Sequence, residues 1–309
     1  CRTCMPSAGC ATNSCSAARV IDPASITLTK YLSCRRFTAT PAGPADASLF
    51  DRALPAPKMT RAARRGTMRR TMCNRYLPTI REKLIGLGFT LQDETDWERA
   101  IGPRQPGPFV LPDRRVVVGQ WGLIPPYAKE RHPRARDGRP LMTNNARIEG
   151  IESKPTFRDA WRRGQRCVVP ADAFVEPYWG TGRNTWWSFS RADGRPWMLA
   201  GLWSDWTDPA TGEVVPSYTM VTVNADAHPL MRLMHKPDPT LPDDAQDKRS
   251  VVPLADDAIA AWLRGPEDEA RAALVGPPID AYRHGPEDPT RTVELPLGPH
   301  ARTDRPGPP

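Results

Sequence analysis

The sequence predicts an α+β domain built on a mainly antiparallel β-sheet with a few flanking helices. Runs rich in β-branched and aromatic residues recur through the middle of the chain, and most follow one another without a crossover helix. Glycine and proline separate these runs, and only a few short stretches have helical periodicity. No apolar stretch reaches the roughly eighteen residues of a membrane helix, so we expect no membrane partner.

The expected elements follow in chain order. A short helix is expected first, at Pro78–Leu87. Strands are expected at Arg115–Trp121, Arg166–Pro170, Thr185–Ser190, Trp197–Trp203, Tyr218–Asn224 and Ser250–Leu254. Two further helices are expected at Thr156–Arg163 and Ala255–Leu263. The pair Asp193-Gly194 between two strands indicates a hairpin turn.

Charge and composition divide the chain near residue 72. The first 72 residues hold twelve Lys and Arg against three Asp, a net of +9 in a chain of +8, which leaves −1 for the rest. This acid-poor, Ser- and Arg-rich stretch lacks periodicity, as a disordered leader does. We therefore expect a disordered basic leader (1–72) outside the fold, a folded domain (73–283) and a Pro-rich tail (284–309).

Three interpretations of the leader stay open: a disordered or targeting segment, a zinc module on its cysteines, or upstream sequence joined to a gene that starts at Met72. The spacing of its first four cysteines lacks the paired pattern of zinc modules, and the start at Met72 is favoured. Beyond the leader only Cys73 and Cys167 remain, which indicates a reducing, cytoplasmic compartment. We expect no metal or other cofactor in the domain.

Cys73 directly follows Met72, and that position gives it a distinct chemistry. A small second residue permits removal of the initiator methionine, which leaves an α-amine and a thiol on one residue. Their ordinary pKa values of about 8 and about 8.5 leave both partly reactive near neutral pH. The amine condenses with an aldehyde to an imine, and the thiolate then closes a thiazolidine ring. Taken alone, however, Cys73 is more simply an ordinary mid-chain cysteine.

A series of short motifs puts Cys73 in context. They occur in this order: Met72–Tyr76, Trp121–Pro125, Asn145–Glu149, Lys154–Phe157, Arg166–Glu176, Ala200–Trp203, Thr222–Ala225 and His235. In order and spacing they resemble the motifs of the SOS response-associated peptidase (SRAP) family, the abasic site processing proteins. The resemblance implies that the chain binds single-stranded DNA and crosslinks to abasic sites through Cys73, in the response to DNA damage.

The resemblance also implies three further catalytic residues, whose side-chain chemistry suits the reaction. Asn145 offers an uncharged amide that can hold the amine or a sugar oxygen, although Asn144 is its neighbour. Glu176 follows apolar residues, which favour a raised carboxyl pKa and proton shuttling, but it can also merely pair at a strand end. His235 is the acid/base near neutral pH, with His228 as the alternative.

DNA contacts are expected at Arg75, Trp121, Gly122 and Arg147. Because the domain carries a net charge of −1, these contacts must be local. Arg147 is expected to clamp a phosphate beside the lesion, and Arg75 to contact another. Trp121 is expected to stack on DNA bases, whereas the other tryptophans, Trp186 among them, are expected mostly in the core.

The chain departs from the family pattern at three places. Asn74 replaces a glycine, and the segment Trp97–Pro108 is barely recognisable. After His235 the usual Asp-Arg-Met-Pro is absent, which indicates an insertion before Asp247-Lys248-Arg249.

Several functions fit these residues. Beyond crosslinking, an imine can undergo β-elimination, which gives lyase activity, and Cys73 can attack the peptide bond before it, which gives peptidase activity. Two alternatives are a thiol peptidase or N-terminal-nucleophile hydrolase acting on peptides, and a single-stranded DNA-binding module without chemistry. We expect a monomer.

Overall fold

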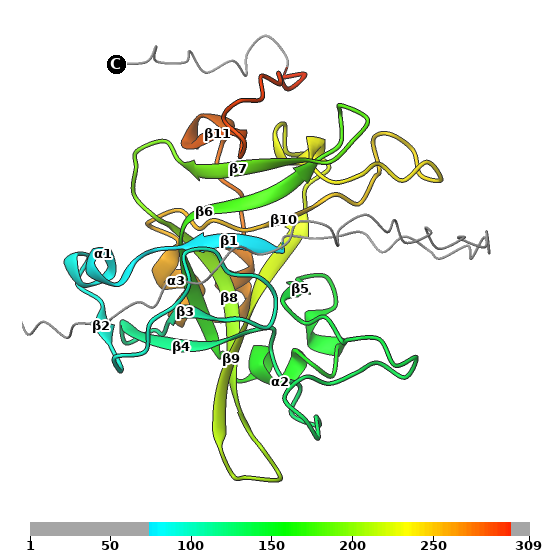
Figure 1. Ribbon diagram of the computed structural model, residues 1–309. Helices are drawn as coiled ribbons and strands as arrows, with labels where there is room; N and C mark the ends of the chain where they lie inside the picture. Colours follow the sequence, from blue (N-terminus) through cyan, green and yellow to red (C-terminus); the bar gives the residue numbers. More distant parts are fainter. Residues whose placement is uncertain (1–73, 298–309) are drawn as a thin grey trace, which may run out of the picture. The chain divides into compact units, whose positions relative to one another are not determined.

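The computed structural model describes residues 74–297, which form mostly β-sheet (Figure 1). The strands are β1 (Arg75–Pro78), β2 (Thr90–Leu91), β3 (Pro106–Val110), β4 (Arg115–Trp121), β5 (Asn145–Arg147), β6 (Arg166–Tyr178), β7 (Thr185–Arg191), β8 (Trp197–Thr207), β9 (Val214–Asn224), β10 (Arg249–Val251) and β11 (Tyr282–Pro286). The helices are α1 (Arg81–Gly86), α2 (Arg158–Arg162), α3 (Ile259–Arg264) and α4 (Glu267–Ala272), with 3-10 turns η1 (Ile151–Ser153), η2 (Met231–Leu233) and η3 (Ile279–Ala281). The expected leader, Cys73 and residues 298–309 lie outside the described part.

The sheet is mainly antiparallel, which confirms the predicted fold class. Among the described strands eight pairings are antiparallel, and three, β2·β4, β4·β9 and β5·β9, are parallel. Strands β3, β4, β9, β8 and β6 pair in turn, and β6 pairs back onto β3, so these five close into a ring. Because the ring is closed, each of its five strands has a partner strand on both sides.

The predicted hairpin at Asp193-Gly194 is wrong. Strand β6 pairs with β8 through its first half (Arg166–Ala171) and with β7 through its second half (Phe174–Tyr178). β7 and β8 therefore pair with successive parts of β6 and not with each other. The turn between them interrupts a single run along β6, and both Arg191 and Arg195 form ion pairs with Asp193 there.

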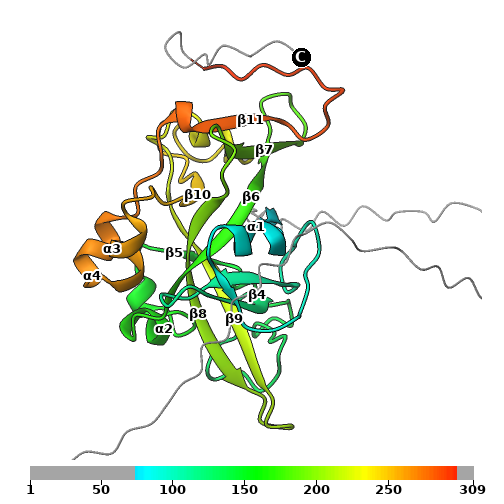
Figure 2. The same ribbon diagram turned by 90° about the vertical axis from the view of Figure 1, so that its left-hand side faces the viewer.

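Two apolar clusters fill the domain. One gathers aromatic side chains that include Tyr76, Phe109, Trp121 and Tyr218, and the other includes Val168, Trp161 and Trp262. Helices α3 and α4 pack against each other on one flank of the strands (Figure 2). None of the helices among residues 74–297 is long and apolar enough to cross a membrane.

The C-terminal strand β11 pairs with β7 as far as Pro286. Beyond it Val293, Leu295 and Leu297 pack against the larger aromatic cluster. Pairing therefore continues three residues past the expected start of the tail, and the limits of the folded domain stay a prediction.

Candidate active site

The described chain begins beside the second half of β6. Arg75 pairs with Val175 and Tyr76 with Phe174 in an antiparallel register, and Asn74 and Glu176 are the next residues beyond the Arg75–Val175 pair. Cys73, the expected nucleophile, lies outside the described residues. The site is therefore built from what surrounds Asn74.

Glu176 and His235 form a buried pair at this point. Their side chains are 1% and 8% exposed, and Glu176 Oε2 lies 3.5 Å from His235 Nε2. His235 Nε2 also lies 2.9 Å from the main-chain carbonyl of Arg249. A carbonyl only accepts, so Nε2 carries the hydrogen and donates it. The other ring nitrogen, Nδ1, is buried.

Main-chain contacts hold His235 in an unusual conformation. Its φ of +63° is in the left-handed region, where residues other than glycine are uncommon. Its N–H donates to the Pro177 carbonyl at 2.6 Å, and its own carbonyl accepts from Lys248 Nζ at 2.8 Å. The predicted insertion returns to the site, because Gln246 Nε2 donates to the Leu241 and Pro242 carbonyls and Lys248 comes back beside His235.

Arg249 is a buried cation next to this pair. The sequence indicated it only as part of the basic segment after the insertion and predicted no role for it. Its guanidinium donates to both carboxylate oxygens of Glu149, at 3.1 and 2.5 Å, and to the Thr222 carbonyl at 3.0 Å. Glu149 lies in the Asn-Ala-Arg motif segment. Partial burial is the largest influence and raises its pKa, but the hydrogen bond from Arg249, main-chain hydrogen bonds and the charge of Arg249 together lower the pKa below its usual value. The network thereby fixes the main-chain segment whose carbonyl receives the His235 hydrogen.

The two neighbouring asparagines are both buried but do different things. Asn145 begins β5, is 7% exposed and pairs in register with Met220 of β9. Asn144 Nδ2 donates to Asn74 Oδ1 at 3.1 Å, and its carbonyl accepts from Trp121 Nε1 at 2.9 Å. Asn144, weighed only as a competitor of Asn145, therefore touches the residue bonded to Cys73. The only sign of this second asparagine in the sequence was that Asn144 and Asn145 are consecutive.

The expected DNA-binding residues separate into two exposed arginines and a buried pair. Arg147 forms a 2.9 Å ion pair with Asp247, and Arg75 pairs with Glu287. The structure contradicts the stacking role expected for Trp121, which is 0% exposed and packs edge-on against Tyr76 with ring centroids 5.1 Å apart. Gly122 is buried with it at a φ of +134°, a conformation that favours glycine.

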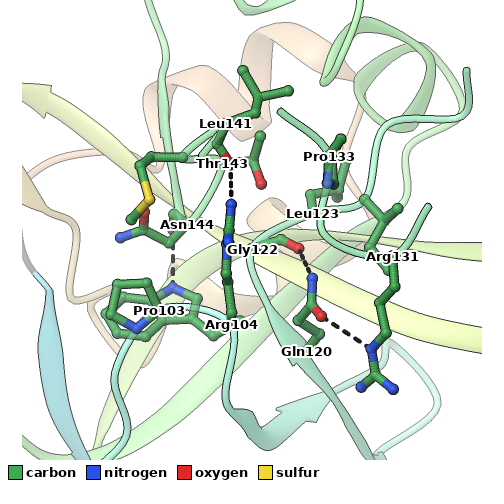
Figure 3. A pocket seen from close by; sticks show the side chains of 13 residues that line it. Pro103, Arg104, Gln120, Gly122, Leu123, Arg131, Pro133, Leu141, Thr143 and Asn144 are labelled. Carbon is green, nitrogen blue, oxygen red and sulfur yellow. Dashed lines mark hydrogen bonds between the residues drawn. The ribbon is translucent and has the colours of Figure 1, made fainter. Parts of the chain in front are cut away.

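A shallow pocket adjoins Asn144 on the side of Gly122 (Figure 3). Arg104 reaches across it toward the Leu141 carbonyl at 3.4 Å, and Arg131 Nε donates to Gln120 Oε1 at 3.1 Å. The lining of this pocket therefore contains two cations, Arg104 and Arg131, together with Asn144, although the domain as a whole is close to neutral.

The remaining candidates have structural roles. His228 Nδ1 accepts the main-chain N–H groups of Leu230 and Met231, and its Nε2 donates to the Pro277 carbonyl at 3.0 Å. Burial lowers the pKa of His228, so it is a neutral residue that caps η2. Burial raises the pKa of the Cys167 thiol, which makes it a poor nucleophile. In residues 74–297 no three His, Cys, Asp or Glu side chains gather as metal ligands do.

A family model described as "SOS response associated peptidase (SRAP)" matches residues 72–284. The chain belongs to this family. A solved structure of a protein from Bordetella bronchiseptica, 34% identical, covers 72% of this chain and all of its own with a TM-score of 0.60. A second, from Bacteroides thetaiotaomicron, is 19% identical with a TM-score of 0.56 and shows the same fold.

Two named relatives are more distant in sequence. The chain is 28% identical over 204 residues to "Abasic site processing protein HMCES" of Gallus gallus, covering 56% of this chain and 55% of that protein. It is 30% identical over 144 residues to "Abasic site processing protein YoqW" of Bacillus subtilis, covering 46% and 59%. The chain thus spans about half the length of these relatives.

Proposed function

We propose that this chain captures abasic sites in single-stranded DNA through Cys73, once Met72 and everything before it has been removed. The observation that supports this most strongly is that Asn74, the residue bonded to Cys73, directly precedes the Arg75–Val175 pair of β1 and β6, and that Val175 is followed by the buried Glu176, which pairs with His235. The names of the relatives point to the same substrate.

The reaction needs an amine, a thiol and a route for protons. The α-amine of Cys73 adds to the aldehyde of the ring-opened sugar, and loss of one water gives an imine. The thiolate then adds to the imine carbon, and the ring nitrogen takes up the proton. His235 and Glu176 are suited to deliver and remove these protons, while Asn145 orients the amine or the sugar oxygen. The product protects the lesion from strand cleavage.

Two further activities belong to the same proposal. The imine can lose the 3′ phosphate by β-elimination, which is a lyase step. If a leader precedes Cys73, the Cys73 thiol can attack the carbonyl before it, break the C–N bond and form a thioester with the leader. Water then hydrolyses the thioester, which releases the leader and frees the thiol and the α-amine; this is the peptidase step that the family description suggests. Arg75 and Arg147 are the proposed phosphate contacts.

The test uses protein that begins at Cys73 and an oligonucleotide with one abasic site. A heat-stable band of lower mobility should appear on a denaturing gel, and Cys73→Ala should remove it. Cys167→Ala is the matched control and should keep the band, because that thiol is fully buried. If the parent protein gives no band, the proposal fails. Repeated turnover of a peptide probe with abasic DNA ignored would favour a hydrolase instead.

A further inference from the structure

Trp186 is exposed where the other tryptophans are not. All ten tryptophans lie within the described residues, and Trp186 alone is exposed, at 40%. Its neighbour Trp187 is 2% exposed, since successive side chains of a strand point to opposite faces.

The exposed indole lies one position along the strands from Glu176, on the opposite face of the sheet. Trp186 on β7 pairs with Pro177 on β6, and Pro177 directly follows Glu176. On the other edge of β6, Arg75 pairs with Val175, two positions before Pro177. Arg75 and Trp186 therefore reach the same face of the sheet from opposite sides of β6, beside the start of the described chain.

Arg75 and Trp186 also contact each other. The Arg75 guanidinium carbon lies 5.3 Å from the centroid of the Trp186 ring, within cation–π distance. Glu287, the residue after β11, holds this arrangement through an ion pair with Arg75 and a 2.9 Å hydrogen bond from its N–H to the Trp186 carbonyl. The result is an exposed indole with a positive charge held over its ring.

A second contact of the same kind involves the β6–β7 hairpin. Trp179 directly follows β6, and the ammonium of Lys236, from the segment after η2, lies 5.1 Å from the centroid of its ring. The β6–β7 hairpin thus carries two aromatic rings, each with a cation near its ring. Alternation of aromatic rings and positive charge is the chemistry with which proteins bind single-stranded nucleic acid.

We propose that Trp186 and Arg75 form a binding site for a nucleotide that neighbours the lesion in single-stranded DNA. The base stacks on the indole, and the phosphate takes over from Glu287 as the partner of Arg75. Because every base has a π-face, the site tolerates any sequence. The site rests on the proposed function for its substrate, and it takes the stacking role that the buried Trp121 cannot fill.

The test uses the full chain and a single-stranded oligonucleotide without an abasic site, so that Cys73 chemistry does not enter. Trp186→Leu should weaken binding by about 5- to 150-fold, the range for loss of one stacked base, whereas Trp186→Phe should stay close to the parent. Val214→Ala removes an apolar side chain at the start of β9 that is more exposed than Trp186, and serves as the control. The leader is present in every sample, so its own binding cancels in the comparison.

Photo-crosslinking gives a direct second readout. An oligonucleotide with 5-iododeoxyuridine should crosslink to the peptide that contains Trp186, identified by mass spectrometry. Unchanged affinity in Trp186→Leu, or crosslinks only at other residues, overturns the stacking site even if the abasic band still forms. Conversely, a missing abasic band with Trp186-dependent binding leaves the stacking site standing and removes the Cys73 chemistry. An unchanged melting temperature in Trp186→Leu excludes unfolding as the cause.

Discussion

Replacing Arg249 by methionine tests whether the buried ionic network supports both the fold and the His235 site. Arg249 is 4% exposed and donates to Glu149 and to the Thr222 carbonyl. Methionine keeps most of the side-chain volume and removes the charge and all of these donors. The main-chain carbonyl that accepts the His235 hydrogen is not deleted, so any effect on His235 comes from displacement of that segment.

The expected cost follows from the partners. The bond to the Thr222 carbonyl is a charged one in a buried place, worth about 1.5–3 kcal/mol. The Glu149 carboxylate is half exposed and can return to water, so its share is about 0–1 kcal/mol. The Thr222 carbonyl keeps the Ile148 N–H at 3.0 Å. We therefore expect Arg249→Met to lower the free energy of unfolding by about 2–3 kcal/mol.

Urea unfolding measures this loss, and a thermal scan should show a fall of roughly 4–12 °C for a domain of this size. Glu149→Gln is the control, with an expected loss of about 1 kcal/mol or less, because its amide oxygen can still accept. The same Arg249→Met protein should form the abasic crosslink more slowly. If Arg249→Met lowers the free energy of unfolding by less than about 0.5 kcal/mol, the level of an ordinary surface substitution, then the buried network of Arg249 does not stabilise the fold.

Two other predictions concern the core and the pH dependence. A Cβ atom at Gly107 would collide with the hydroxyls of Tyr76 and Tyr218, which contact each other. Gly107→Ala should therefore lower the free energy of unfolding by about 1–3 kcal/mol, measured from the midpoint of urea unfolding. An unchanged midpoint would show that the two tyrosines move aside without loss of stability. Burial lowers the pKa of His228, so the unfolded state binds more protons and stability is lost as pH falls below about 6.5. The parent should therefore lose more stability between about pH 7 and 5 than His228→Gln does, in thermal scans, and equal losses would contradict it.

The sequence predicted those elements whose own residues carry the pattern. Strand β4 has the predicted limits, Arg115–Trp121, because its β-branched run is uninterrupted. Strand β3 was missed because Pro106 and Pro108 lie within it. These prolines are tolerated because that half of β3 pairs only with β4, and only Val110 also pairs with β6. Strand β5 has three residues and exists only through its partner β9.

Side-chain orientation was harder to predict than the position of the motifs. The motifs led to Glu176 and His235, which the fold brings within 3.5 Å of each other. Two tryptophans were predicted wrongly: Trp121 was expected to stack on DNA and is buried, and Trp186 was expected in the core and is exposed. For Trp186 the reason is that the sequence of the Trp186-Trp187 pair does not reveal which ring faces outward. Lys248 and Arg249 were identified in the sequence as basic residues that an insertion separates from His235, but their return to His235 is revealed only by the folded loop.

The most direct test of the central claim is the mass of the residue that carries the DNA. Protein beginning at Cys73 is allowed to react with abasic DNA and then digested with nuclease and protease. Thiazolidine formation predicts a single adduct on the Cys73 peptide, whose mass is that of the peptide plus the sugar phosphate less one water. Both the amine and the thiol of Cys73 should be blocked in this adduct. An adduct on Cys167 or a lysine, or one that leaves the Cys73 amine free, would contradict it.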